Sequence, residues 1–129
     1  MVALDTHELA WAAGFFDGEG TISFKPNGKG NKGRPDIQIA QSEVYPLERF
    51  KLAVGVGKVY GPYGPYTTQS KPYWLYDAGL PANVQLVIER MWKYLSPTKR
   101  GQIERALILT KEANSRPYLK TGPKPKGVA

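Results

Sequence analysis

The sequence predicts an α+β domain in which an antiparallel sheet carries its helices on one face. Two patterns lead to this prediction. Four stretches have the apolar spacing of helices, and four short stretches have the pattern of strands; they follow in the order helix, strand, strand, helix, strand, strand, helix, helix. A chain of 129 residues is also long enough to bury a core as one domain.

The opening helix has clear boundary signals. Asp5 is suited to the N-cap position, and Glu8 three residues later completes a capping box. The apolar residues 9–16 form the body of the helix. Glycine is suited to stopping a helix, and two glycines come shortly after Asp17. We therefore expect the helix to end at Asp17.

A hairpin with a long loop follows this helix. Residues 21–26 and 36–41 alternate between polar and apolar side chains, and the intervening residues 27–35 form a basic loop. The apolar faces of these strands consist of Ile22 and Phe24 in the first and Ile37 and Ile39 in the second.

Three more helices and a second pair of strands complete the order. We expect helices over residues 45–57, 80–95 and 96–113, and strands over residues 58–63 and 71–76. The positions expected to face the core from these helices are Leu47, Phe50, Leu52 and Val54, then Val84, Val87, Ile88, Met91 and Leu95, and finally Ile103, Leu107 and Leu109.

The domain is expected to span residues 1–113. Residues 114–129 are rich in proline and basic residues and poor in apolar ones. This composition is typical of a tail that stays disordered or is ordered by a partner.

The composition excludes several kinds of site. The chain has no cysteine and one histidine, His7, so disulfides, thiolate metal sites and multi-histidine sites within one chain are excluded. Any metal must then be a hard cation held by oxygen atoms. The net charge of +7 favours an anionic polymer or surface as partner. Because no long apolar run or signal-peptide pattern occurs, we expect an intracellular protein outside the membrane.

Two acids, Asp17 and Glu19, stand at the end of the opening helix, where the macrodipole disfavours negative charge. Ala10 and Gly14 have a spacing that lets another backbone approach, although an alanine-rich helix on its own sheet has the same composition. If two copies of the helix pack together, both Glu19 carboxylates meet, and divalent cations would reverse their repulsion. With the free Gly18 carbonyl, these oxygens suit Mg²⁺ and could serve one phosphodiester on each strand of a duplex.

The same stretch is similar to a known motif. Residues 12–20, AAGFFDGEG, resemble the nine-residue motif that names the LAGLIDADG homing endonucleases. Gly14, Asp17 and Gly20 match it letter for letter, and Glu19 stands at its second acid. The order of helices and strands also agrees with that family. The resemblance implies an αββαββα(α) domain with a saddle-shaped antiparallel sheet, and a homodimer through the first helix because the motif occurs once.

The resemblance also implies roles for individual residues. The metal-binding acid falls on Glu19, assisted by the carbonyl of Gly18, with Mg²⁺ or Mn²⁺ as cofactor. Gln41 matches a polar residue near the attacking water, and Lys99 matches a lysine beside the scissile phosphate. Arg49 is the one candidate for a further basic residue that such enzymes often carry, and we expect it instead to be an exposed helix residue. The residues implied at the dimer interface are Ala10, Ala13, Gly14 and Asp17.

The two hairpins predict a surface for double-stranded DNA. The major groove of B-DNA admits a two-stranded β-ribbon and shows a distinct pattern at each base pair. The hairpin faces, basic loops and tail are the expected contacts, although a basic loop can also be a merely solvated charge run. Which face of residues 71–76 is outward stays open. The expected contacts are Ser23, Lys25, Lys29, Lys32, Arg34, Gln38, Lys58, Tyr60, Lys71 and Lys120.

These observations and the resemblance together predict a homodimeric, divalent-metal-dependent endonuclease. It would cut both strands of a long, near-palindromic site and serve the mobility of an intron or intervening sequence. Two alternatives remain open: a DNA-binding regulator that has lost cleavage, and an RNA-splicing maturase, since basic loops and exposed aromatic residues also suit RNA. The target site and the compartment, whether a bacterial or phage cytoplasm or an organelle, stay undecided.

Overall fold

The computed structural model of the chain describes residues 4–28 and 32–115. In chain order its elements are α1 (Thr6–Glu19), β1 (Gly20–Pro26), β2 (Gly33–Gln41), α2 (Val44–Val54), β3 (Lys58–Tyr63), β4 (Tyr73–Ala78), α3 (Pro81–Met91), the short 3₁₀ helix η1 (Trp92–Tyr94) and α4 (Pro97–Ser115). The predicted order of helices and strands is confirmed. None of the helices in this part of the chain is long and apolar enough to cross a membrane.

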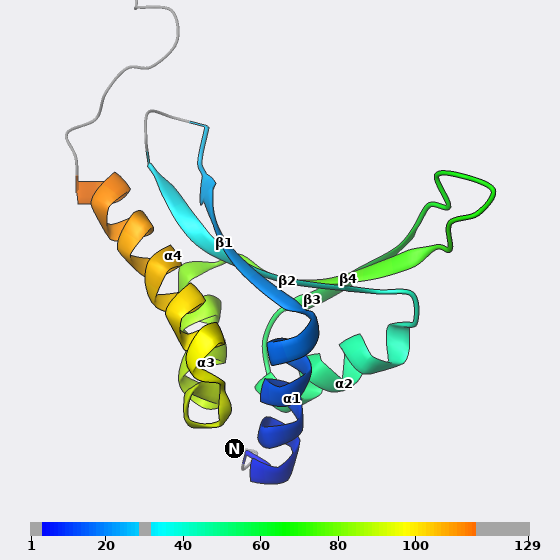
Figure 1. The fold of residues 1–129 in the computed structure, drawn as a ribbon, viewed down its shortest axis with the longest axis horizontal. Helices are drawn as coiled ribbons and strands as arrows, with labels where there is room; N and C mark the ends of the chain where they lie inside the picture. Colours follow the sequence, from blue (N-terminus) through cyan, green and yellow to red (C-terminus); the bar gives the residue numbers. More distant parts are fainter. Residues whose placement is uncertain (1–3, 29–31, 116–129) are drawn as a thin grey trace, which may run out of the picture.

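The four strands form one antiparallel sheet in the order β1-β2-β4-β3. β2 is paired on both sides, with Ile39 opposite Gly20 of β1 and opposite Tyr76 of β4. Figure 1 shows the sheet as a curved layer, with the helices against its convex face and its concave face turned away from them. The predicted α+β architecture with a saddle-shaped sheet is confirmed.

The core lies between the sheet and the helices. Phe16 of α1, Phe50 of α2 and Tyr76 of β4 are fully buried, and the rings of Phe50 and Tyr76 meet edge to face with centroids 4.8 Å apart. The Tyr76 hydroxyl donates a hydrogen bond to the carbonyl oxygen of Val56 at 2.8 Å, which satisfies its buried polar atom. Burial raises the pKa of Tyr76. The parity of β4, left open by the sequence, is thereby fixed, with Tyr76 directed into the core.

Element boundaries differ from the predicted ones by a few residues. α1 is capped by the Asp5 carboxylate as predicted, but it runs to Glu19 because the amide of Gly20 still donates to the carbonyl of Phe16. β2 begins at Gly33 rather than at residue 36, since its pairing with β1 extends to Pro26. The earlier start of β2 shortens the loop between β1 and β2 relative to the prediction.

Three predicted core positions are wrong. Leu52 is 83% exposed, because α2 turns Ala53 and the following valine towards the core instead. Leu107 and Leu109 of α4 are also exposed, because the small side chain of Ala106 lies against the core. Local apolar spacing therefore identified these helices without fixing which face each one buries.

Candidate functional site

The end of α1 exposes an acidic group. Glu19 is the last residue of α1, its side chain is exposed, and the last turn contains no basic residue. Among the described residues, Glu19 has no hydrogen-bond or ion-pair partner. The carbonyls that follow Phe16 in α1, including that of Gly18, have no further helical amide to accept from. The helix end thus offers unpaired oxygen atoms, which are the ligands of hard divalent cations.

Gly20, which follows this acid, is packed against the ring of Phe16. A Cβ atom on Gly20 would lie 2.0 Å from that ring. The backbone of Gly20 has φ −88°, which any residue can adopt. Lack of space, and not backbone conformation, therefore requires glycine at this position.

Asp17 ties the end of α1 to the start of α4. Its carboxylate accepts hydrogen bonds from the Ser96 amide at 3.1 Å and from the Ser96 hydroxyl at 2.9 Å. The Ser96 hydroxyl oxygen in turn accepts from the amide of Lys99 at 3.1 Å, which is the bond of an N-cap. Asp17 is thus engaged inside its own chain, and its expected place at a dimer interface stays a prediction.

Lys99 reaches the end of α1 from α4. Its side chain is only 7% exposed, and its ammonium group donates to the carbonyl oxygen of Gly20 at 2.8 Å. The far end of α4 is fixed as well, because the Asn114 amide exchanges two hydrogen bonds of 2.9 Å with the backbone of Gly33. A helix anchored at both ends therefore holds the lysine one residue away from Glu19.

Gln41 lies at the same end of the sheet. It is the last residue of β2, is half-buried and pairs with Trp74 of β4. Since Ile39 lies opposite Gly20, Gln41 comes two residues further along β2 towards the last turn of α1. The structure thus places Glu19, Gln41 and Lys99 around one helix end, and their catalytic roles stay predictions.

Arg49 lies elsewhere, and the expectation that it is simply exposed is corrected. Its guanidinium group donates to both carboxylate oxygens of Glu8, at 2.9 and 2.7 Å, and stacks 4.0 Å from the centroid of the Trp11 ring. The hydrogen bonds from Arg49 lower the pKa of Glu8. Glu8 is in the first turn of α1 and Glu19 in the last, so Arg49 fastens α2 to α1 far from the acidic helix end.

One face of α1 carries only small, exposed residues. Ala10, Gly14 and Gly18 follow at intervals of four along the helix and are all exposed. A Cβ atom at Gly14 or at Gly18 would meet no atom of the described residues within 4 Å, apart from its chain neighbours and the backbone of its own helix. Ala13, in contrast, is fully buried in the core and offers no surface to a second subunit. The open stripe is therefore narrower than the predicted interface.

The concave face of the sheet carries the polar side chains of both hairpins. Lys25 of β1 lies opposite Arg34 of β2, and Gln38 of β2 lies opposite Asp77 of β4. Lys58 and Tyr60 of β3 are exposed, and the valine between them packs against the core. Ser23 is exposed on the same strand as Lys25. The placement agrees with the predicted polar faces, and contact with DNA stays a prediction.

Sequence reasoning missed two acids on this face. Asp36 is 1% exposed, and the Lys25 ammonium lies 3.2 Å from its Oδ2 atom. Asp77 accepts a hydrogen bond from the side-chain amide of Gln38 at 3.1 Å. The alternation around Ile37 already assigns Asp36 to the polar face, so the signal was present in the sequence.

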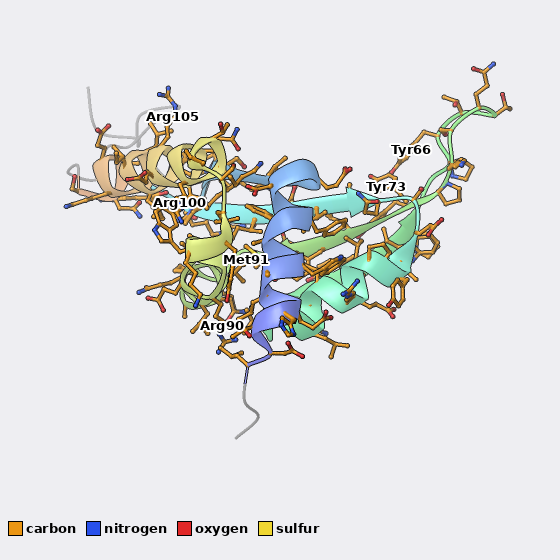
Figure 2. The ribbon with its side chains drawn as sticks, turned by 60° about the horizontal axis from the view of Figure 1, so that its bottom comes forward. Tyr66, Tyr73, Arg90, Met91, Arg100 and Arg105 are labelled. Carbon is orange, nitrogen blue, oxygen red and sulfur yellow. The ribbon has the colours of Figure 1, made fainter. Side chains whose placement is uncertain are left out.

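The remaining predicted contacts belong to loops and to the tail. The Lys32 ammonium donates to the carbonyl oxygen of Asn114 at 2.6 Å, and Lys71 is exposed in the loop between β3 and β4. Figure 2 shows Tyr66 and Tyr73 close together where this loop leaves the sheet, and their ring centroids are 6.3 Å apart. The predicted contacts outside the described residues are Lys29 and Lys120.

Comparison with solved structures gives a consistent group. The homing endonuclease I-CvuI, in complex with an uncleaved DNA target in the presence of Mg, aligns with a TM-score of 0.65 and 20% identity over 86% of this chain and 72% of that one. The LAGLIDADG homing endonuclease I-GzeII, in complex with a DNA target, aligns with a TM-score of 0.64 and 20% identity over 88% of this chain and 37% of that one.

A third structure matches nearly end to end. The archaeal intron-encoded homing endonuclease I-Vdi141I, complexed with DNA, aligns with a TM-score of 0.60 and 16% identity over 91% of this chain and 89% of that one. No model of a protein family matches this chain, and neither does the sequence of any curated protein. At these identities the likeness shows the fold.

Proposed function

We propose that this chain, which has the fold of the LAGLIDADG homing endonucleases, is a divalent-metal-dependent DNA endonuclease that cuts both strands of a specific site as a homodimer. One observation carries the proposal. The Lys99 ammonium donates to the carbonyl of Gly20, the residue after Glu19, whose exposed carboxylate has no partner among the residues that the structure describes. An acid at a helix end and a cation bound to the next residue are the kinds of group that phosphodiester hydrolysis employs.

The residues at the end of α1 fit a hard divalent cation. The Glu19 carboxylate and the Gly18 carbonyl would hold it, with Mg²⁺ or Mn²⁺ as the cation. In the described part of the chain, no three carboxylate or imidazole groups are close enough to hold a metal ion. The other ligands would therefore come from the second subunit, water and the DNA phosphate. When bound, such a cation lowers the pKa of a water molecule and neutralises charge on a phosphate.

The protein groups around this position have separate tasks. Lys99 uses one of the three N–H donors of its ammonium group on Gly20, which leaves two for a phosphate oxygen. Those donors would stabilise the negative charge that develops as the phosphodiester is attacked. Gln41, at the adjacent end of β2, would orient the attacking water through its amide.

The stripe of small residues on α1 supports the proposed homodimer. Ala10, Gly14 and Gly18 leave room for a second helix backbone to approach closely. Two copies of α1 packed along this stripe bring two Glu19 side chains near a twofold axis. Each carboxylate would then serve one strand of a duplex lying on the concave faces of the two sheets, in keeping with the net charge of +7.

The test is cleavage of a randomised duplex library with Mg²⁺ and with EDTA. We would compare the natural protein with Glu19→Gln and with the control Glu48→Gln, which changes an exposed acid on α2. Double-strand ends that require Mg²⁺ and Glu19, and that survive in the control, support the proposal and reveal the site. If the protein enriches certain sequences but leaves them uncut, the endonuclease proposal is wrong and a DNA-binding regulator takes its place. Absence of any enriched duplex would favour the RNA-binding alternative.

A further inference from the structure

A linked row of polar side chains crosses the concave face of the sheet. Lys25 on β1 pairs with Asp36 on β2 at 3.2 Å, and Asp36 interacts with Asp77 on β4. The row ends on Gln38 of β2, whose Nε2 atom donates to Oδ1 of Asp77 at 3.1 Å. Gln38 and Asp77 are also direct partners in the strand register. We call these four residues the polar row.

Two acids in contact are an unusual feature on a face that otherwise carries cations. Asp36 is 1% exposed, and its Oδ2 atom forms no hydrogen bond among the described residues, although Lys25 lies within ion-pair distance. Burial, and then the hydrogen bond to Asp77, raise the pKa of Asp36. The charged groups facing the pair are Lys25 from β1, Arg34 from β2 and Lys58 opposite Asp77 on β3. Burying two carboxyl groups next to each other costs stability. Stability therefore does not account for the presence of Asp36 and Asp77 at these positions.

The side-chain amide of Gln38 can form hydrogen bonds with a DNA base. A glutamine amide has two N–H donors and one acceptor oxygen. The Asp77 carboxylate can only accept, so it faces the nitrogen of the Gln38 amide and excludes the flipped orientation. One N–H of the Gln38 amide is thereby occupied, while its second N–H and its Oε1 atom remain available to a ligand. These two groups are what a bidentate contact with N7 and N6 of adenine requires in the major groove.

The acids also determine which part of a duplex the row can meet. A carboxylate next to a DNA phosphate is repelled, whereas base edges carry no net charge. Lys25 is partly neutralised by Asp36, so it too is less suited to a phosphate than an unpaired lysine. The polar row therefore fits the floor of the groove, and unpaired cations elsewhere on the face fit the backbone.

We propose that Asp77 is a positioning residue for sequence recognition, which fixes the Gln38 amide so that Gln38 reads an adenine in the major groove. The proposal rests on the DNA-binding function proposed above. Asp77 itself would not contact the base. Loss of Asp77 frees the amide to rotate, so the discrimination made by Gln38 is lost although Gln38 is still present.

The experiment selects bound sequences from a randomised duplex library and compares base preferences at every position. The proteins are the natural chain, Gln38→Ala, Asp77→Ala and the double variant, with Asp77→Asn as the conservative control because its Oδ1 atom can still accept from Gln38. Gln38→Ala is expected to lose about tenfold or more of the preference for A·T at one base pair. Asp77→Ala is expected to relax the same pair, Asp77→Asn to keep the preference, and the double variant to lose no more than Gln38→Ala.

Each other outcome is informative. If the natural chain enriches a site but Asp77→Ala leaves it unchanged, or relaxes a base pair that Gln38→Ala does not, the positioning proposal is overturned while the DNA-binding function stands. If the natural chain enriches no sequence, both fall. If Asp77→Ala does not fold, as judged by circular dichroism, Asp77→Val takes its place, since valine favours strands and has no acceptor.

Discussion

The ammonium group of Lys99 and the backbone carbonyl of Gly20 are 79 residues apart in the sequence and 2.8 Å apart in the structure. This hydrogen bond joins α4 to the point where α1 becomes β1. The exposed carboxylate of Glu19 is the neighbouring side chain along the chain. The candidate active site thus includes a long-range contact between a helix side chain and the backbone, next to the contact of Asp17 with Ser96.

Replacing the ammonium group of Lys99 should lower both the cleavage rate and the stability of the fold. Lys99→Met keeps the buried apolar stem and removes the charge, so cleavage should fall by about a hundredfold or more. Because the Gly20 carbonyl loses its partner, the free energy of unfolding should fall by about 1–3 kcal/mol. Single-turnover cleavage and chemical denaturation measure the two effects. Lys51→Met, on the exposed side of α2, is the control, and an equal cleavage rate in both variants would contradict the role of Lys99.

A methyl group on Gly20 should destabilise the fold through its clash with Phe16. Gly20→Ala places a Cβ atom 2.0 Å from the Phe16 ring, so the free energy of unfolding should fall by about 1–3 kcal/mol. Gly18→Ala is the matched control, because its Cβ atom meets no described residue outside the backbone of α1 within 4 Å, and alanine favours the helix. Urea denaturation compares them. A loss in Gly20→Ala no larger than in Gly18→Ala would show that the ring can move aside.

A bulky residue among the small residues exposed on α1 should break the proposed dimer and leave the subunit folded. Gly14→Leu fills the space through which a second helix would approach, and leucine is a better helix former than glycine. We expect monomers in sedimentation velocity that keep the helical circular dichroism of the natural chain. Gly101→Leu is the control, because Gly101 is also exposed on a helix with open space at its Cβ position. A Gly14→Leu protein that remains a dimer would move the interface to another surface.

Asp36 predicts a pH dependence of stability. Burial and the hydrogen bond to Asp77 raise the pKa of Asp36 above its ordinary value of 3.8, and the pairing with Lys25 opposes this shift without reversing it. A raised pKa means that the folded chain binds the proton more tightly. The free energy of unfolding contributed by this group is therefore greatest below its ordinary pKa and falls as pH rises through the raised value.

Asp36→Asn removes this titration. The melting temperature of Asp36→Asn minus that of the natural chain should therefore increase between about pH 4 and about pH 7. Thermal unfolding in a series of buffers measures the difference, which cancels the titration of other acids such as Glu8. A difference that decreases over this range would mean that Asp36 is stabilised as the ion.

The order of elements could be predicted because its signals are local. The cap at Asp5 and the alternation around Ile37 each involve a few consecutive residues, and both are present in the structure. Which face a helix buries is not local in this sense. Leu52 and Leu107 continue the apolar spacing and are nevertheless exposed. As α2 and α4 pack in the fold, the neighbouring alanines, Ala53 and Ala106, are buried in their place.

The candidate site was predictable only in part. The motif indicated Glu19 and the wider family resemblance indicated Lys99 as candidates, whereas no spacing in the sequence indicates that α1 and α4 meet. The contact between Asp17 and Ser96 was missed because Ser96 could be recognised as a helix start, but the carboxylate that binds it comes from a distant segment. Asp77 was missed because the outward face of its strand was not determined by the aromatic residues around it.

Because Glu19 and Lys99 are far apart in the sequence, a partly synthesised chain contains one of these two proposed site residues without the other. During synthesis, Glu19 leaves the ribosome long before α4 has been made. A chain interrupted before α4 has the acid but lacks both Lys99 and the Ser96 that ties this helix to Asp17. If the protein cuts DNA as proposed, only finished and correctly folded copies can do so, and truncated products leave the chromosome intact.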